Sequence, residues 1–205
     1  MKIFNNNKED IITAGEMLLK GKLVAFPTET VYGVGVVYDN LESYEKLNKF
    51  KKRNPNKPYT LMLDDVNKIK DYADVNPREF RFLQLILPGA VTVVLKAKDS
   101  LPKHCIGAKE GTIGIRVPAY KITSDLLKAV GKPLLVPSLN KSGEKPINDV
   151  NVIKKKFNKN LDGLLVGQVR DNVPSTVISL MDHKIKVIRE GKMSSKVLIE
   201  EYNNL

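Results

Sequence analysis

The sequence predicts an α/β fold in which short buried strands alternate with amphipathic helices. Apolar runs rich in β-branched residues, at residues 23–26 and 91–96, are typical of strands from the interior of a sheet. Apolar residues recur at three-residue steps over residues 41–50, which indicates a helix with one buried face. Because no repeat, low-complexity tract or change of composition marks a boundary, residues 1–205 are expected to form a single domain.

The composition is strongly basic. Lys and Arg number 34 against 23 Asp and Glu, which gives a formal net charge of +11. Such a chain attracts polyanions such as nucleotides or RNA through its long-range field. The alternative is that lysines scattered among asparagines only form a solvated surface.

The cysteine and histidine content argues against disulfides and structural zinc. Cys105 is the only cysteine, and of the two histidines only His104 lies near it in sequence. We expect Cys105 to be a partly buried small residue, and we predict no metal site built from side chains. No apolar run is long enough to span a bilayer, and the start lacks the apolar core of a signal peptide. A cytoplasmic protein without a membrane partner is therefore expected.

Polar residues follow the first buried strand, residues 23–26, which Pro27 ends because proline has no N–H to donate. Thr28, Glu29 and Thr30 then place two hydroxyls and a carboxylate where an open α/β sheet usually binds its ligand. The alternative is that they serve only as turn and cap residues.

Two glycines follow the same strand. Gly33 and Gly35 are expected to leave room for a ligand to approach the backbone. Tyr38 stands where a dinucleotide-binding fingerprint would have its third glycine, and no Walker loop occurs, so any nucleotide is held by another device.

The other helices follow from caps and periodicity. A first helix behind Asn7 or Asp10 ends at Gly21, and the helix at residues 41–50 begins at Asp39 or Asn40. Further helices are predicted over residues 65–87, 122–130, 149–157 and 197–202, the second of these ending at Gly131.

A basic segment follows the helix at residues 41–50. Residues 49–58 contain five cations, and Pro55 and Pro58 stiffen the backbone. Cations held on a stiff loop are well placed to bind phosphates, although a solvated loop would also explain the lysines.

The remaining strands also carry polar residues. In the strand at residues 111–118, Arg116 shares one face with Thr112, and an arginine inside a sheet requires an anion. The strand at residues 133–136 leads into a loop that could form an anion nest; its candidate residues are Ser138, Asn140, Ser142 and Gly143. A strand is expected at residues 164–166, and residues 174–180 and 185–191 are expected to pair as a hairpin.

Seven segments, in order along residues 23–191, resemble the motifs of the YrdC-like threonylcarbamoyl-AMP synthases of the single-domain type. One such match is unspecific, whereas seven in the family's order are highly specific. The segments are Pro27-Thr28-Glu29-Thr30-Val31-Tyr32-Gly33, Lys51-Lys52-Arg53 with Lys57-Pro58, Leu87-Pro88-Gly89, Gly114-Ile115-Arg116-Val117-Pro118, Pro137-Ser138-Leu139-Asn140-Lys141-Ser142-Gly143, Pro174-Ser175-Thr176 and Ile188-Arg189-Glu190-Gly191.

The resemblance implies a fold and a reaction. The fold is a twisted, mostly mixed α/β sheet with flanking helices around a basic cavity, of the YrdC/RibB-like type. The reaction joins L-threonine, bicarbonate or CO2, and ATP into threonylcarbamoyl-AMP and pyrophosphate. The product supplies the threonylcarbamoyladenosine modification of tRNA through a downstream threonylcarbamoyl-transferase complex. Mg²⁺ is expected to accompany ATP, with phosphate and water as most of its ligands.

The resemblance also implies the site residues. Lys51 and Arg53 would be catalytic, with Lys51 reaching the carbamate or the phosphates, and Arg116 would hold the threonine carboxylate. The implied threonine-site residues are Thr30, Met62, Arg116, Val136 and Ser175. The implied ATP-site residues are Arg53, Lys57, Thr112, Ser138, Asn140, Ile147 and Arg189.

Three positions depart from the family's pattern. Lys52 replaces a glycine, Leu139 replaces an alanine and Met62 replaces a frequent histidine. Leu139 is expected to face the core, whereas Met62 loses a polar contact.

Two other functions compete with the synthetase. An RNA-binding module of the same fold, without synthetase activity, would bind tRNA or double-stranded RNA through its charge. A carbamoyl-transfer domain of hydrogenase maturation is disfavoured, because those domains sit in much longer chains with zinc-finger-like cysteines.

Overall fold

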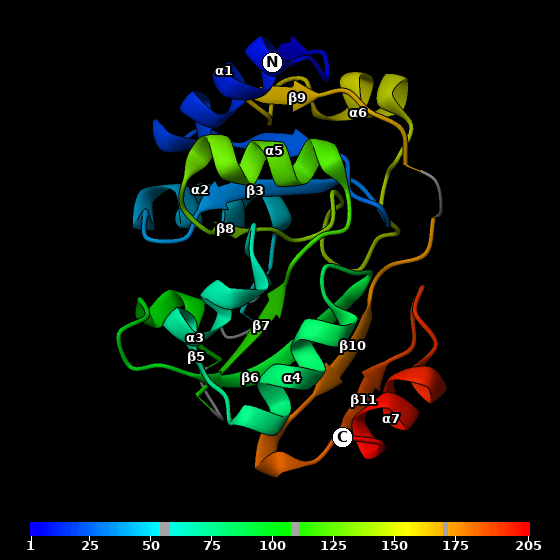
Figure 1. The fold of residues 1–205 in the computed structure, drawn as a ribbon. Helices are drawn as coiled ribbons and strands as arrows, with labels where there is room; N and C mark the ends of the chain where they lie inside the picture. The colour runs from blue at the N-terminus through cyan, green and yellow to red at the C-terminus, as the bar shows by residue number, and fades with distance from the viewer. Residues whose placement is uncertain (54–57, 108–110, 170–171) are drawn as a thin grey trace.

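The computed structural model describes residues 1–53, 58–107, 111–169 and 172–205, and Figure 1 shows how their elements are arranged. In this part of the chain, eleven strands form one mixed sheet with the order β1-β9-β2-β3-β8-β4-β7-β6-β10-β11, and β5 pairs with β6. The strands are β1 (Lys2–Phe4), β2 (Val24–Phe26), β3 (Gly33–Val37), β4 (Leu61–Met62), β5 (Ala73–Asp74), β6 (Val91–Ala97), β7 (Thr112–Arg116), β8 (Leu134–Leu135), β9 (Gly163–Leu165), β10 (Thr176–Ser179) and β11 (Lys186–Arg189). The helices are α1 (Lys8–Leu19), α2 (Leu41–Lys51), α3 (Ile69–Tyr72), α4 (Pro77–Ile86), α5 (Lys121–Val130), α6 (Val150–Phe157) and α7 (Ser195–Asn203).

The strand pairings confirm the predicted mixed sheet. Strand β2 runs parallel to β9 and antiparallel to β3, and β7 runs parallel to β4 and antiparallel to β6. The predicted C-terminal hairpin is also present, because β10 pairs antiparallel with β11.

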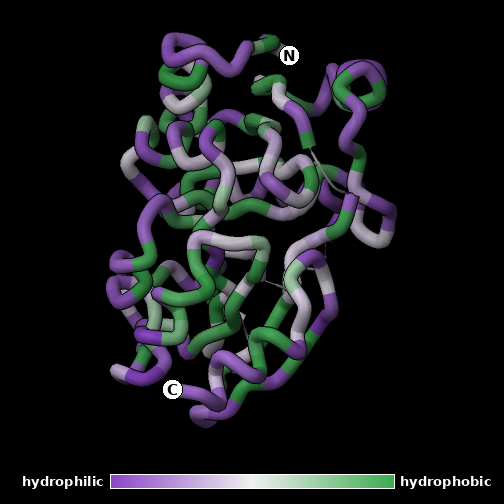
Figure 2. The backbone as a smooth tube through the Cα atoms, turned by 45° about the vertical axis from the view of Figure 1, so that its right-hand side comes forward, coloured by the Kyte–Doolittle hydropathy of each residue, from purple (hydrophilic) through white to green (hydrophobic). Residues whose placement is uncertain are grey.

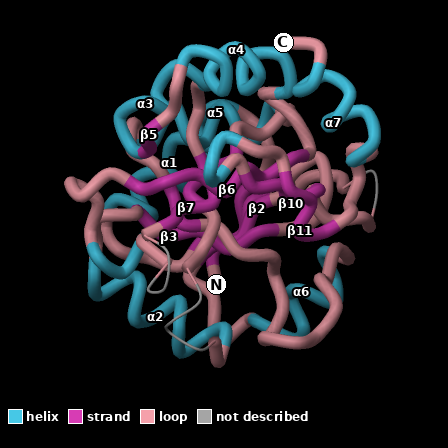
Figure 3. Tube along the Cα trace, turned by 90° about the horizontal axis from the view of Figure 1, so that it is seen from below, coloured by secondary structure: helices cyan, strands magenta, loops and turns pink. Residues whose placement is uncertain are grey.

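Helices cover both faces of the sheet. Figure 3 shows α2 and α6 on one side of the strands and the other helices on the opposite side. Beneath α1 and α5 the core is fully buried, and its large side chains are Phe4, Leu18, Phe26, Leu126 and Leu165. Figure 2 shows the same segregation, with hydrophobic residues along the strands and hydrophilic residues on the outer turns. Burial of this apolar surface is the main force that holds the layers together.

Local signals fix the helix ends as expected. The Asn7 side chain accepts the N–H of Asp10 at 2.9 Å, and the Asn40 side chain accepts the N–H of Ser43 at 3.0 Å. Each bond satisfies a backbone donor that a helix start leaves without a partner. Helix α5 ends at Gly131, whose φ of 68° is a left-handed conformation that glycine adopts without steric cost.

The segment at residues 65–87 differs from the continuous helix that its sequence predicts. It contains a 3-10 turn (Val66–Lys68), the short helix α3 and strand β5 before α4 begins. Asn76 and Glu79 form a reciprocal capping box at the start of α4, so a new helix begins there. Ala73 pairs with Ala97 of β6, so β5 is a strand of the sheet and not part of a helix.

Gly33 and Gly35 also serve a different purpose from the predicted one. Both lie in β3, where an added Cβ at Gly33 would lie 2.5 Å from Val136 Cγ1. At Gly35 an added Cβ would lie 2.7 Å from Phe26 Cε1. Protein side chains already fill this space, so the prediction that these glycines leave room for a ligand is wrong. They allow neighbouring core side chains to approach the strand backbone.

Cys105 is fully buried and its thiol donates to the carbonyl of Tyr38 at 3.4 Å. Burial raises the pKa of this thiol to about 12, which keeps it protonated and unreactive at neutral pH. Among the helices that the structure describes, none has the length and apolar character to cross a membrane.

Candidate functional site

A cavity of about 460 Å³ lies where β4, β7, β6 and β10 meet the loops that follow β2 and β8. Nine of the thirteen predicted site residues line it: Arg53, Met62, Thr112, Arg116, Val136, Ser138, Asn140, Ser175 and Arg189. They come from segments that are far apart in sequence, and the fold brings them together.

Of the other four predicted site residues, three do not line the cavity and one is not described. Thr30 and Lys51 are buried, and each hydrogen bonds to a residue that lines the cavity. Ile147 packs against the hydrophobic core beside the lining residue Pro146 and is not part of the wall. Lys57 lies outside the described residues.

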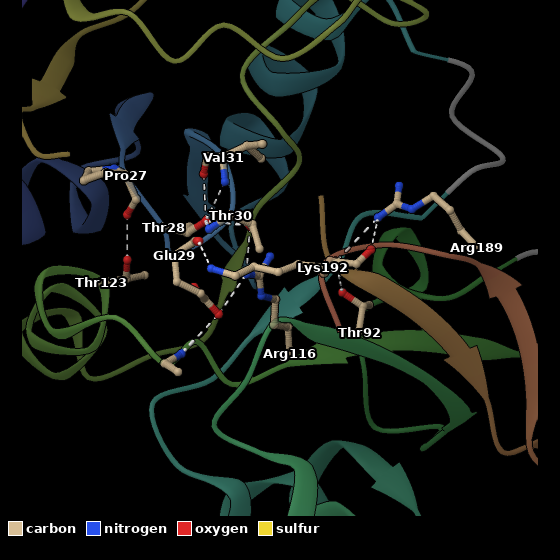
Figure 4. A network of polar contacts seen from close by, with 12 residues as sticks. Pro27, Thr28, Glu29, Thr30, Val31, Thr92, Arg116, Thr123, Arg189 and Lys192 are labelled. Carbon is tan, nitrogen blue, oxygen red and sulfur yellow. Dashed lines mark hydrogen bonds and ion pairs between the residues drawn. The ribbon is translucent and has the colours of Figure 1, made fainter. Parts of the chain in front are cut away.

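The turn after β2 is closed by its own side chains (Figure 4). The hydroxyl of Thr28 donates to the carbonyl of Val31 at 2.7 Å and accepts the N–H groups of Thr30 and Val31 at 3.2 Å. The hydroxyl of Thr123 in α5 donates to the carbonyl of Pro27 at 2.6 Å. These bonds hold Glu29 and Thr30 in one orientation at the edge of the cavity.

Arg116 ends β7 against this turn. Its Nη2 lies 2.9 Å from Glu29 Oε1 and 2.9 Å from Thr30 Oγ1, and only 6% of the residue is exposed. The anion that the sequence requires for Arg116 is therefore Glu29, as Figure 4 shows. Glu29 stands at the strand end in the sequence but is not among the predicted site residues. Its position inside the Pro27–Gly33 motif was the available signal.

A second network surrounds Lys51, at the end of α2. Its Nζ donates to the carbonyl of Ser138 and to Asn140 Oδ1, each at 2.6 Å. Burial, with Arg53 and then Lys141 as smaller causes, lowers the pKa of Lys51 to about 8. The ammonium is therefore still mostly protonated at pH 7 but titrates within reach of physiological conditions.

The same network fixes the loop after β8. Ser138 Oγ donates to Asn140 Oδ1 at 2.7 Å, and the N–H of Ser142 donates to the carbonyl of Lys51 at 2.8 Å. Because that N–H is already used, it is not available to the predicted anion nest. Ser138 and Asn140 face the cavity.

Two more arginines line the cavity. Arg53 Nη2 donates to the carbonyl of Pro58 at 2.9 Å, and its guanidinium lies 4.9 Å from the centre of the Tyr59 ring. Arg189 Nη2 donates to the carbonyl of Ser175 at 2.7 Å. Burial, and secondarily the charge of Arg116, lowers the pKa of Arg189. The cavity is thus strongly cationic and suited to anions.

Comparison with known proteins identifies the family. The Sua5/YciO/YrdC family model, whose description is "Telomere recombination", matches residues 16–191. The chain belongs to the Sua5/YciO/YrdC family.

Individual relatives agree with this family. Over 188 residues, 91% of each chain, the protein is 31% identical to the uncharacterized protein YciO of Escherichia coli. The E. coli YciO crystal structure superposes with a TM-score of 0.89 and 30% identity, covering 96% of this chain and 98% of that one. This similarity confirms the predicted fold class.

Two further relatives are connected with threonine, one by its name and one by the ligand in its crystal structure. The Bacillus subtilis threonylcarbamoyl-AMP synthase is 27% identical over 194 residues, which is 94% of this chain and 56% of that protein. The crystal structure of Pyrococcus abyssi Sua5 complexed with L-threonine superposes with a TM-score of 0.91 and 26% identity. It covers 98% of this chain and 61% of that one. This member of the Sua5/YciO/YrdC family therefore spans about three fifths of the length of both relatives.

The departures from the family's motifs have structural explanations. Lys52 caps α2 with a φ of 51°, the left-handed region that glycine prefers. Leu139 is fully buried, which confirms that it faces the core. Met62 is 1% exposed in β4 and pairs in register with Arg116. It gives this end of the cavity an apolar side chain.

A second cavity of about 570 Å³ lies beside α4 and the turn between β10 and β11. It contains none of the predicted site residues, and one of its polar contacts joins His183 Nδ1 and Glu79 Oε1 at 2.9 Å. No cluster of three or more His, Cys, Asp or Glu side chains suited to a metal occurs within the described ranges. The cavity around Arg116 therefore remains the candidate site.

Proposed function

We propose that this chain is an L-threonylcarbamoyladenylate synthase, a nucleotidyltransferase that makes threonylcarbamoyl-AMP and pyrophosphate from L-threonine, bicarbonate or CO2, and ATP. The observation that carries the proposal is the convergence of Arg53, Arg116 and Arg189 on one cavity, with the buried Lys51 bonded to its wall. Membership of the family, the threonine bound to P. abyssi Sua5 and the name of the B. subtilis relative support it.

Threonine would bind at the Arg116 end. Arg116 would hold the carboxylate and Ser175 would supply a hydroxyl for the polar groups of the amino acid. The buried Thr30 would orient Arg116 through its hydrogen bond. Met62 and Val136 provide an apolar wall for its methyl group. Charge-assisted hydrogen bonds to a guanidinium are among the strongest and most directional that a protein offers.

ATP would bind towards Arg53 and Arg189. The proposed contacts of its phosphates and nucleoside are Arg53, Lys57, Thr112, Ser138, Asn140 and Arg189. Mg²⁺ would be held by phosphate and water, since no side-chain cluster in the described part of the chain suits it, and no step below depends on it.

The chemistry requires positioning and charge neutralisation. The threonine amine bonds to the carbon of CO2 and releases a proton, which gives a carbamate. A carbamate oxygen then attacks the α-phosphorus of ATP while the bond to the β-phosphate oxygen breaks, so pyrophosphate leaves. Lys51 and Arg53 would stabilise the negative charge that develops on these oxygens, and no covalent intermediate with the enzyme is needed.

The biological role follows from the product. Residues 1–205 would act as one domain in the cytoplasm and pass threonylcarbamoyl-AMP to a threonylcarbamoyl-transferase complex that modifies tRNA. The E. coli YciO relative has no characterised activity, so a direct assay is decisive.

The test measures pyrophosphate released from ATP by the purified protein. Release is expected only when L-threonine and bicarbonate are both present, and omission of either is the internal control. No release above background, together with salt-sensitive binding of tRNA or double-stranded RNA, would refute the synthetase and favour an RNA-binding module.

A further inference from the structure

Glu29 is a buried carboxylate beside a cavity in which cations outnumber anions. The charged side chains that line the cavity within the described ranges are Arg53, Arg116 and Arg189 against Glu144. Glu29 lies behind Arg116, and its Oε1 accepts from Arg116 Nη2 at 2.9 Å and from the N–H of Ala119 at 3.2 Å. The carboxylate is thus held on two sides.

The second oxygen of this carboxylate is unusual. Glu29 is 8% exposed, and its Oε2 is buried without a hydrogen-bond partner within the described part of the chain. A buried carboxylate oxygen without a donor is costly and requires an explanation. The Nε of its partner Arg116 is also buried without a hydrogen-bond partner among the described residues, so each member of the pair keeps unused hydrogen-bonding capacity. In the low dielectric of the interior, its negative charge acts over a longer distance than it would in water.

The backbone of Glu29 joins a third segment to the same point. Lys192, which follows β11, donates from Nζ to the carbonyl of Glu29 at 3.2 Å. In Figure 4 this lysine extends towards the Glu29–Arg116 pair from the side of Arg189. The turn after β2, the end of β7 and the segment after β11 therefore meet at Glu29, which limits the movement of its carboxylate.

We propose that Glu29 is a positioning and specificity residue that makes the Arg116 end of the cavity select a carboxylate with an ammonium group beside it. This inference rests on the proposed function, because it concerns the amino acid substrate of that site. Arg116 alone would attract any carboxylate and would repel the ammonium of an amino acid. Paired with Glu29, its charge is offset, so an α-amino acid is preferred to the same acid without the amine.

The experiment compares two ligands that differ only in the amine. Dissociation constants of L-threonine and (R)-3-hydroxybutyrate are measured by calorimetry for the wild type and for Glu29→Gln, which keeps the shape and an acceptor for Arg116. We expect the wild type to prefer threonine and the variant to lose about tenfold or more of that preference. The matched control is Glu42→Gln, an exposed glutamate paired with Lys46 at 2.8 Å, which should keep the wild-type ratio.

Turnover gives a second measurement. Glu29→Gln should raise KM for threonine and leave KM for ATP unchanged, a split that general loss of structure does not produce. Glu29→Asp keeps the charge and should retain the preference for the amine with weaker binding of both ligands. It also serves as the test should Glu29→Gln fail to fold.

The inference is overturned by a folded Glu29→Gln with the wild-type ratio, or by a folded Glu29→Asp that loses the preference. The binding ratio does not depend on catalysis. Absence of pyrophosphate release by the wild type would refute the proposed function, whereas an unchanged ratio would refute only the role of Glu29.

Discussion

Substitution of Arg116 tests how much of the free energy of unfolding depends on its ion pair with Glu29. The variant Arg116→Met keeps the length of the side chain and leaves the Glu29 carboxylate, which is 8% exposed, with the N–H of Ala119 as its donor among the described residues. Breaking one side of a buried ion pair costs about 3–5 kcal/mol, because the remaining charge is not hydrated. At about 2–4 °C per kcal/mol for a chain of this size, Tm should fall by about 6–20 °C.

The double variant Arg116→Met with Glu29→Gln tests the cause of that loss. Since both charges are removed, it should be more stable than Arg116→Met alone by about 1–3 kcal/mol, measured by urea unfolding as a double-mutant cycle. Lys121→Met is the control, because the side chain of Lys121 is 86% exposed and its pair with Asp125 should contribute less than about 1 kcal/mol. A Tm for Arg116→Met within about 2 °C of the wild type, or a double variant no more stable than the single one, would refute the reasoning.

Three further predictions concern Arg53, Lys51 and the residue that caps α2, Lys52. Arg53→Ala should lower kcat/KM for ATP about tenfold or more in the pyrophosphate assay, because it removes a charged anchor of the phosphates; wild-type turnover at subsaturating ATP would contradict that role. Because the pKa of Lys51 is about 8, its ammonium is charged below pH 8 and neutral above it, so kcat/KM for ATP should fall as pH rises through 8. In Lys51→Met, kcat/KM for ATP should be lower below pH 8 and should not fall as pH rises, whereas Lys49→Met should keep the wild-type pH profile. If the fall persists in Lys51→Met, a group other than Lys51 causes it. Lys52→Gly should raise the free energy of unfolding by about 0.5–1 kcal/mol, since relief of left-handed strain exceeds the entropic cost of glycine, and Lys52→Ala, which keeps the strain, should not.

Local signals in the sequence were sufficient for most helix ends. Asn7, Asn40 and Gly131 act on backbone groups only a few residues away, so their effect does not depend on the rest of the fold. The same local reasoning failed at residues 65–87, because pairing of Ala73 with Ala97 is a long-range contact that overrides helical periodicity. It also failed at Gly33 and Gly35, whose neighbours Val136 and Phe26 are known only once the strands are packed.

The sequence by itself determined the family's motifs, the α/β class and the basic character of the chain. Only the tertiary structure decided what each motif contacts. Arg116 bonds to Thr30 across 86 positions, and Lys51 bonds to Asn140 across 89. Only the structure identified Glu29 as part of the site, because its partner Arg116 is distant in sequence and lies on β7. The physical reason is that caps and periodicity act within a few residues, whereas a charged site depends on distances set by the packing of the whole sheet.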